Sequence, residues 1–213
     1  MSSIAHIRKE YRLHAFDKEE AANDAMQQFE RWWNDALKSE IDEVNAMTLA
    51  TSSADGLPAA RIVLLKAFHP GGFQFFTNYE SFKGKQLSEN PRACLVFFWK
   101  ELERQVRITG LVEKLSETES NAYFKARPEG SRIGAWASPQ SNIIESSEWL
   151  IQQAKLYEDK FSDSEIPMPP YWGGYLVRPV TIEFWQGRPN RLHDRLLYTL
   201  QENGEWIIER LAP

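Results

Sequence analysis

The chain has 213 residues, of which 42% are apolar and 13% aromatic, and its net charge is −5. This length can bury a core without disulfides, and the acidic balance argues against a nucleic-acid surface, which needs a basic face. No apolar stretch approaches the roughly 20 residues of a membrane-spanning helix, and the polar first residues do not resemble a signal peptide. We therefore expect a cytoplasmic protein with neither membrane nor nucleic acid as a partner.

Apolar spacing, turn residues and capping residues divide the chain into helices and short strands. Residues 1–20 are rich in charge and predict a flexible N-terminal arm, followed by a single domain at 21–213. Met26, Phe29, Trp33 and Leu37 are spaced for one helix face. In chain order the predicted elements are a helix at 21–37, strands at 47–51, 60–68 and 73–78, a helix at 81–90, strands at 93–99 and 105–115, helices from 116 to about 127 and at 148–161, and strands at 174–177, 181–186, 192–200 and 206–211.

Turn and capping signals define the connections between these elements. Asp55-Gly56 and Asn203-Gly204 are typical hairpin turns, and Ser116 with Glu119 forms a capping box. Short strands joined by hairpins, with helices inserted between them, predict a mainly β, α+β domain built on an antiparallel barrel. No glycine-rich phosphate loop and no metal-ligand spacing is present in the sequence. Cys94 lies in an apolar run and is expected to be buried and unreactive.

The segment 191–195 carries three basic side chains in alternation. On a strand, Arg191, His193 and Arg195 would share one face, with Leu192 and Asp194 on the other. Three cations on one face of an acidic protein need either a bound anion or acidic neighbours such as Asp194. The residues alone leave these two interpretations open.

Tyr123, Arg127 and Ser131 recur every four residues. A phenol, a guanidinium and a hydroxyl that converge on one point would suit a phosphate group. The alternative is a partly exposed helix end. Pro128 and Gly130 make continuation of the helix doubtful, so that Ser131 could belong to a following turn.

Further cations and amides are less informative by themselves. Arg61 and Lys66 bracket an apolar strand on opposite faces, so a shared ligand requires a bulge or a site at the strand's rim. Lys83 and Lys85, near the start of a short helix, could reach an anion or remain solvated.

Several segments, in order along nearly the whole chain from about Arg8 to Pro213, resemble the pyridoxamine 5′-phosphate oxidase family. The segments that carry the resemblance are 61–66 (RIVLLK), 103–106 (ERQV), 133–138 (IGAWAS), 140–141 (QS), 172–174 (WGG), 182–187 (IEFWQG), 191–195 (RLHDR) and 209–213 (ERLAP). Each is weak alone, but the ordered set is specific.

The resemblance implies an FMN-binding split β-barrel that forms a homodimer with flavin at the subunit interface. It implies oxidation of pyridoxamine or pyridoxine 5′-phosphate to pyridoxal 5′-phosphate, with O2 as acceptor and H2O2 as product, and ammonia from the amine. Rival interpretations are a related flavoenzyme with another substrate and a non-catalytic carrier of flavin or pyridoxal phosphate.

The resemblance also implies a site. The catalytic residues would be Arg191 and His193. The residues that would bind FMN are Arg61, Ile62, Val63, Leu64, Leu65, Lys66, Phe76, Thr77, Lys83, Gln105, Gln140, Ser141, Trp185 and Arg195. The residues that would bind substrate are Arg8, Lys9, Glu10 and Tyr11 of the arm, with Lys66, Tyr123, Arg127, Ser131, Arg191, Leu192 and His193.

One position departs from the family pattern. Many relatives carry arginine directly before the lysine of the flavin-phosphate segment, and this chain has Phe82 there. A lost charge-assisted hydrogen bond could weaken FMN binding by roughly 1.5–3 kcal/mol. Lys83 and Arg61, with help from Lys85, would then hold more of the phosphate.

Overall fold

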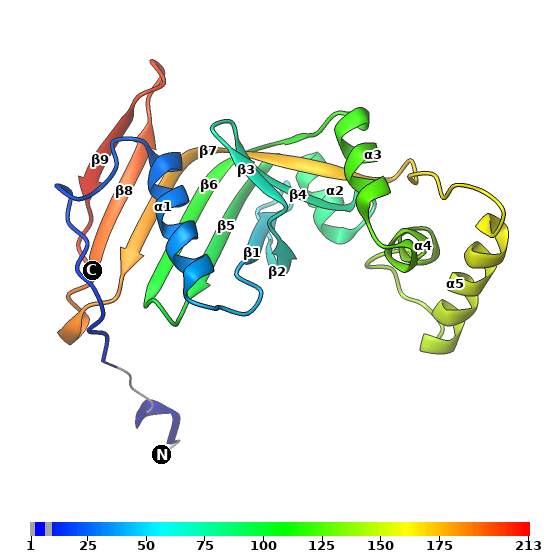
Figure 1. The fold of residues 1–213 in the computed structure, drawn as a ribbon, viewed down its shortest axis with the longest axis horizontal. Helices are drawn as coiled ribbons and strands as arrows, with labels where there is room; N and C mark the ends of the chain where they lie inside the picture. The colour runs from blue at the N-terminus through cyan, green and yellow to red at the C-terminus, as the bar shows by residue number, and fades with distance from the viewer. Residues whose placement is uncertain (1–2, 7–9) are drawn as a thin grey trace.

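A computed structural model describes residues 3–6 and 10–213 of the chain. The described residues form one antiparallel sheet of nine strands with helices inserted between them, which confirms the mainly β, α+β prediction (Figure 1). The strands are β1 (Ala46–Ser52), β2 (Pro58–Leu64), β3 (Ala67–His69), β4 (Gly72–Asn78), β5 (Arg92–Trp99), β6 (Arg104–Lys114), β7 (Trp172–Gln186), β8 (Asp194–Leu200) and β9 (Trp206–Arg210). The helices are α1 (Ala25–Lys38), α2 (Phe82–Glu89), α3 (Glu117–Ala126), α4 (Glu129–Ala137) and α5 (Ser147–Phe161), with short 3-10 turns η1 (Ser3–His6) and η2 (Pro189–Arg191).

The sheet runs in the order β2-β1-β5-β6-β7-β4-β3, and β8 and β9 extend it from the far half of β7. Strand β7 is the longest and crosses the molecule (Figure 1). Its first half pairs with β4 and its second half with β8, while β6 pairs along both halves. One continuous strand therefore joins two ends of the protein that have different neighbours.

The prediction of two strands at 174–177 and 181–186 was wrong, because Pro179 does not end β7. The ladder shifts register between Thr109 and Gly110, beside Pro179, so a residue without an N–H is tolerated there. A Cβ on Gly110 would stand 2.1 Å from the carbonyl oxygen of Arg178, so only glycine fits this close approach.

The predicted strand at 60–68 is also two strands. The Leu65 N–H donates to the Asn45 carbonyl at 2.8 Å, and the Lys66 N–H donates to the Gln74 carbonyl at 2.9 Å. The chain thus leaves β1 and joins β4 between these two residues. This crossing brings Lys66 to the rim of the sheet.

The main core lies between α1 and the inner face of the sheet. Phe29 is fully buried and contacts Phe68, Phe73, Phe97 and Trp99 with ring centroids 4.8–6.1 Å apart. The predicted helix face was wrong at one position: Leu37 is 52% exposed. The buried stripe is centred on Ala25, Phe29, Trp32 and Ala36, and at 100° per residue Leu37 lies at the edge of this stripe.

A smaller core lies under α3, α4 and α5. Phe124, Ile133, Ile166 and Trp172 are its buried members. Helix α4 was not predicted because Pro128 and Gly130 indicate an ending, yet Pro128 stands at the N-cap of α4, where no N–H is needed. Cys94, expected to be buried, is only half-buried because it lies on the outer sheet face.

Candidate functional site

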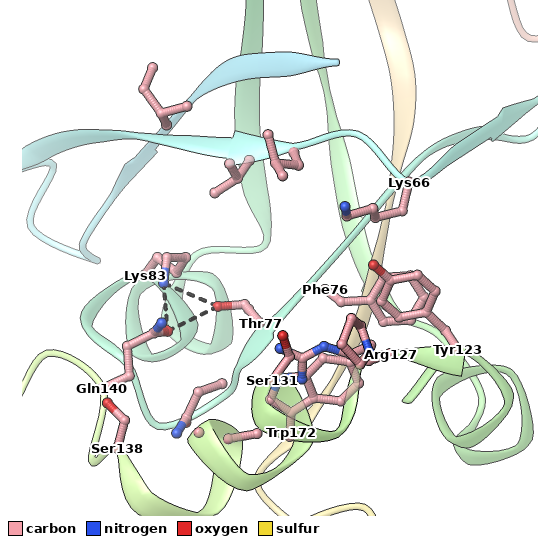
Figure 2. Close-up of a pocket in the computed structure, with 17 residues that line it drawn as sticks. Lys66, Phe76, Thr77, Lys83, Tyr123, Arg127, Ser131, Ser138, Gln140 and Trp172 are labelled. Atoms are coloured by element: carbon pink, nitrogen blue, oxygen red, sulfur yellow. Dashed lines mark hydrogen bonds between the residues drawn. The ribbon is translucent and has the colours of Figure 1, made fainter. Parts of the chain in front are cut away.

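A cavity of about 620 Å³ opens between strands β2 and β4 and helices α2, α3 and α4. Figure 2 shows polar side chains in two groups along it, one around Lys83 and the other around Arg127. The residues that line it are Ile62, Val63, Leu64, Lys66, Phe76, Thr77, Asn78, Lys83, Tyr123, Arg127, Pro128, Ser131, Gly134, Ala135, Ser138, Gln140 and Trp172. Its size is that of a site for one or two small organic molecules.

Lys83 provides a buried cation at one end of the cavity. Helix α2 begins after Ser81, whose hydroxyl caps it, and this places Lys83 in the first turn. The Lys83 ammonium donates to Gln140 Oε1 at 2.9 Å and to Thr77 Oγ1 at 3.1 Å (Figure 2). It also donates to Ser81 Oγ at 3.2 Å. All three acceptors are neutral.

The electrostatics at Lys83 indicate an anion site. Burial, and then the nearby Arg61 guanidinium, lower the pKa of Lys83 to about 8. For a cation that is 9% exposed, the neutral acceptors do not offset the cost of burying its charge. An anionic group placed against Lys83 would remove that penalty.

Arg127 provides the second cationic group. Its Nη1 is buried and has no hydrogen-bond partner among residues 3–6 and 10–213, and burial lowers the pKa of its guanidinium. The guanidinium carbon lies 4.7 Å from the ring centroid of Trp172, which is itself part of a stack with Phe76 and Tyr123. The stack fixes the guanidinium, and its unpaired nitrogen can bind an oxygen anion.

Tyr123, Arg127 and Ser131 all line this cavity, as the four-residue spacing suggested. These three residues do not lie on a single helix, because α3 ends at Ala126 and Ser131 lies in the first turn of α4. Lys66 reaches the same cavity from the sheet rim. The structure thus brings together the four residues for which a phosphate contact was predicted.

Only some residues of the segment 61–66 line the cavity. Ile62, Val63, Leu64 and Lys66 line the cavity, whereas Leu65 points into the main core. Arg61 does not line it, and its Nη1 donates to Thr51 Oγ1 at 2.6 Å and to the Leu49 carbonyl at 3.1 Å.

The other predicted residues of this region are Phe76, Thr77, Gln140 and Ser141. The first three line the cavity. Ser141 follows Gln140 with a φ of 72° and does not line the cavity.

A second cluster of predicted residues lies on the outer sheet face. Cross-strand pairing aligns Phe98, Gln105, Trp185 and Arg195 in one row over β5, β6, β7 and β8. Beside this row, the buried Glu183 carboxylate accepts from Arg195 Nε at 2.8 Å and from Arg107 Nη1 at 2.9 Å. Glu183 was not predicted, although its position two residues before Trp185 puts both on one strand face.

Arg191 and His193 precede β8. The prediction that Arg191, His193 and Arg195 share one strand face was therefore wrong, since β8 begins only at Asp194. Arg191 ends turn η2 with a φ of 62°, and Leu192 beside it is 69% exposed. His193 packs on Trp185 with ring centroids 4.6 Å apart.

Part of the predicted arm contacts this cluster. The Tyr11 ring lies 5.6 Å from that of Trp185 and 5.9 Å from that of His193, centroid to centroid. Glu10 is exposed beside it, and Arg8 and Lys9 lie outside the described residues. The backbone N–H groups of Arg12 and Leu13 donate to the buried Glu103 carboxylate at 2.8 and 3.1 Å.

The cavity and the His193 cluster lie at opposite ends of β7, the long strand labelled in Figure 1. Trp172 lines the cavity and Trp185 contacts His193, and these two residues are thirteen positions apart on the strand, or about 40 Å. No small ligand can touch both ends of one chain.

Sequence reasoning did not identify Trp172, Asn78 and Ser138 as site residues, although they line the cavity. One feature of the sequence could have identified Trp172. It directly precedes Gly173-Gly174, and a glycine pair marks a place where other groups can approach the backbone closely. Within residues 3–6 and 10–213, no helix has the length and apolar character to span a membrane, and no group of three potential metal ligands is found.

Comparison with solved structures defines the class of fold. A pyridoxamine 5′-phosphate oxidase-related, FMN binding protein from Nostoc punctiforme superposes with a TM-score of 0.71 at 19% identity, over 90% of this chain and 100% of the other. PhzG from Burkholderia lata, solved with tetrahydrophenazine-1-carboxylic acid, gives a TM-score of 0.88 at 28% identity, over 94% and 98%. The fold is the split barrel that the resemblance implied.

Comparison of sequences then gives the family. The pyridoxamine 5′-phosphate oxidase model matches residues 33–160, and the pyridoxine 5′-phosphate oxidase C-terminal dimerisation region matches residues 172–213. Pyridoxine/pyridoxamine 5′-phosphate oxidases from Trichormus variabilis and Cupriavidus necator are 56% and 53% identical, over 99% and 100% of each chain. This chain belongs to the pyridoxamine 5′-phosphate oxidase family.

Proposed function

We propose that the chain is an FMN-dependent oxidase that converts pyridoxamine 5′-phosphate and pyridoxine 5′-phosphate to pyridoxal 5′-phosphate. The observation that carries the proposal is one cavity with two separate cationic groups, at Lys83 and at Arg127. Two phosphorylated ring compounds, a flavin and a substrate, need two such groups. The family membership and the 53–56% identical relatives support the same reaction.

The residues present fit a phosphorylated flavin. Lys83 and Thr77 would hold its phosphate, and Gln140 would bind beside them. The chemistry that a bound flavin supplies is acceptance of a hydride from the substrate carbon and transfer of the electrons to oxygen, which yields H2O2. With the amine substrate, water then releases ammonia and leaves the aldehyde.

Lys66, Tyr123, Arg127 and Ser131 would bind the substrate phosphate. This group does not react, so its binding energy can fix the reacting carbon. Arg191 and His193 would lie against the pyridine ring and orient it.

Two copies of the chain would complete the site. Because the cavity and the His193 cluster lie about 40 Å apart along β7, one copy's cluster can reach only another copy's cavity. The outer sheet face supports such a dimer, since Ile62, Phe98 and Leu111 on it are 49–65% exposed. Gln105, Trp185 and Arg195 belong to this face and would contact FMN at the interface.

The direct test is to purify the protein, record its flavin spectrum and measure H2O2 release with pyridoxamine 5′-phosphate. Pyridoxine 5′-phosphate and tetrahydrophenazine-1-carboxylic acid serve as comparison substrates. Peroxide from the B6 phosphates but not from the phenazine compound is expected. A flavin-loaded protein that oxidises neither B6 phosphate would contradict the proposal.

Subunit complementation tests the shared site. Arg127→Ala and His193→Ala are each expected to be poorly active as homodimers. Unfolding the two variants together and refolding them should restore activity, because random pairing leaves about a quarter of the sites with both residues intact. No recovery in dimers shown to be mixed would mean that one chain supplies both residues.

A further inference from the structure

The connection from β7 to β8 holds the His193 ring in a defined state. The backbone N–H of Arg188 donates to His193 Nδ1 at 3.1 Å. The same connection has two consecutive left-handed residues, Asn190 and Arg191, with φ of 56° and 62°. Such backbone is costly for residues other than glycine, so neighbouring contacts must hold it in place.

The accepted hydrogen bond decides where the imidazole proton sits. A ring nitrogen that accepts an N–H cannot carry a proton itself, and a neutral imidazole has one proton. The proton of neutral His193 is therefore on Nε2. Within the described residues, Nε2 makes no hydrogen bond, while Trp185 and Tyr11 pack against the ring.

Protonation of His193 would oppose this arrangement, because a cationic ring would turn an Nδ1–H toward the Arg188 N–H. The charged or titratable groups around the ring are Arg188 and Arg191 in its own connection, Asp194 on β8 and Tyr11 on the arm. Burial and then Arg191 lower the pKa of His193 from 6.5, and Asp194 raises it to a smaller extent. The neutral ring is therefore retained to a lower pH than in a solvated histidine.

Asp194 links the ring to the arm. Its carboxylate accepts the Phe16 N–H at 3.0 Å and lies 3.4 Å from Arg188 Nε, and Arg210 Nη1 donates to it at 2.9 Å. Arg188 is the residue whose N–H fixes the tautomer, and Phe16 anchors the arm that carries Tyr11. One carboxylate therefore contacts both segments that pack around His193.

We propose that His193 acts as a hydrogen-bond donor through Nε2 toward an acceptor atom of the substrate, not as a proton acceptor, and that Asp194 is the positioning residue for this state. The role toward substrate rests on the proposed function, whereas the tautomer is a property of the chain by itself. The acceptor would be an electron-rich oxygen or nitrogen of the pyridine compound. An Nε2–H donor can orient such a ring without changing its own charge.

Nuclear magnetic resonance of protein with 15N-labelled histidine tests the tautomer without substrate or turnover. The chain has four histidines, and loss of one signal set in His193→Gln assigns residue 193. The expected spectrum near neutral pH has a protonated Nε2 and an unprotonated Nδ1. A proton on Nδ1, or a cationic ring near neutral pH, would overturn the proposal.

Two amide variants test the donor in the flavin-loaded enzyme. Glutamine can present an N–H near the Nε2 position, whereas asparagine reaches only the Nδ1 position. His193→Gln should keep kcat/KM within about tenfold of wild type, and His193→Asn should lose as much as His193→Ala. Equal losses in the glutamine and alanine variants would contradict a donor role.

Asp194→Asn should give a mixture of tautomers at His193 and a raised KM with a smaller change in kcat. Asp17→Asn is the matched control, because it removes an ion pair of Arg210 and leaves Asp194 in place. An unchanged tautomer in Asp194→Asn would remove Asp194 from the proposal. If B6 phosphates are oxidised but the proton is on Nδ1, only this inference fails; if no oxidation occurs, the proposed function fails and the measured tautomer stands.

Discussion

The basic side chains at the two ends of β7 differ in whether carboxylates pair with them. At the cavity, and among the residues that the structure describes, the acceptors of Lys83 are all neutral and a buried nitrogen of Arg127 has no partner. At the far end, Arg195 is paired with Glu183, and Arg210 with Asp194 and Asp17. Cations without a carboxylate partner are suited to binding anions, whereas cations paired with carboxylates hold a fixed geometry. This difference agrees with the proposed roles, in which the first end would bind the phosphate groups and the second would orient the substrate ring.

The largest expected effect is at the substrate end of the cavity. Arg127→Ala should raise the KM for pyridoxamine 5′-phosphate and lower kcat/KM by roughly 10- to 150-fold, because a charge-assisted contact is worth about 1.5–3 kcal/mol. The measurement is steady-state peroxide release. Lys125, in the last turn of α3 two residues before Arg127, forms an exposed ion pair with Glu165, and Lys125→Ala should leave both constants near wild type.

Lys83→Met should separate binding from stability. FMN affinity should fall by roughly 10- to 100-fold, while the flavin-free protein should become more stable by about 1–3 kcal/mol at pH 7. The pKa of Lys83 is about 8 in the folded chain against 10.5 ordinarily, so the folded chain bears the cost of a buried charge below pH 8. Wild-type stability should rise between pH 8 and 10.5, where the unfolded chain holds more protons.

Flavin titration and urea unfolding of flavin-free protein measure these two effects. Lys85, which the sequence suggested as a further phosphate contact, is exposed on the same helix and does not line the cavity, so Lys85→Met should alter neither. A destabilised Lys83→Met protein would mean that this lysine supports the fold.

Glu183→Gln should lower the stability of the flavin-free protein, whereas Lys83→Met should raise it. It removes the buried charge that pairs Arg107 and Arg195 and should destabilise the fold by about 1–2 kcal/mol, since both arginines are partly exposed. Urea unfolding measures this change. Glu113→Gln, in an exposed pair with Arg178, is the control and should have little effect.

FMN binding should also depend on pH through Lys83. Phosphate binding favours the ammonium form, so each unit above about pH 8 should weaken affinity by at most about tenfold, with proton uptake. Calorimetry in buffers of different ionisation enthalpy measures the uptake. A flat profile in wild type, matching that of Lys83→Met, would assign the phosphate contact elsewhere.

The smallest expected effect is that of Phe82→Arg. Phe82 is 51% exposed and is the first residue of α2. Added cationic charge should tighten FMN binding by only about two- to fivefold, because the partial positive charge at the helix start opposes a cation there. Flavin dissociation rates provide the measurement, and looser binding would show that the site prefers an apolar residue.

Local signals in the sequence predicted local structure well. The capping box at Ser116 and Glu119 is present, and Ser81 caps α2 as predicted. The spacing of Tyr123, Arg127 and Ser131 left a phosphate site and an exposed helix end both open, and the resemblance named them as a site. The structure brings them to one cavity because turns of adjacent helices face it. Helix α4 was missed because Pro128 indicates an end and a start equally well.

Long-range features were not available from local pattern. Alternation at 191–195 predicted a strand, but two left-handed residues and the contacts of Asp194 delay β8. The separation of the two clusters depends on β7 continuing past Pro179, which only the facing Gly110 permits. The resemblance named residues from both ends, while the roughly 40 Å between them is a property of the folded strand.

The continuity of β7 has a consequence for dilution. If each catalytic centre combines the start of this strand in one copy with its end in another, a single separated chain carries parts of two centres but no complete centre. Turnover per chain should then decrease as the protein is diluted and the copies separate, even while every molecule remains folded.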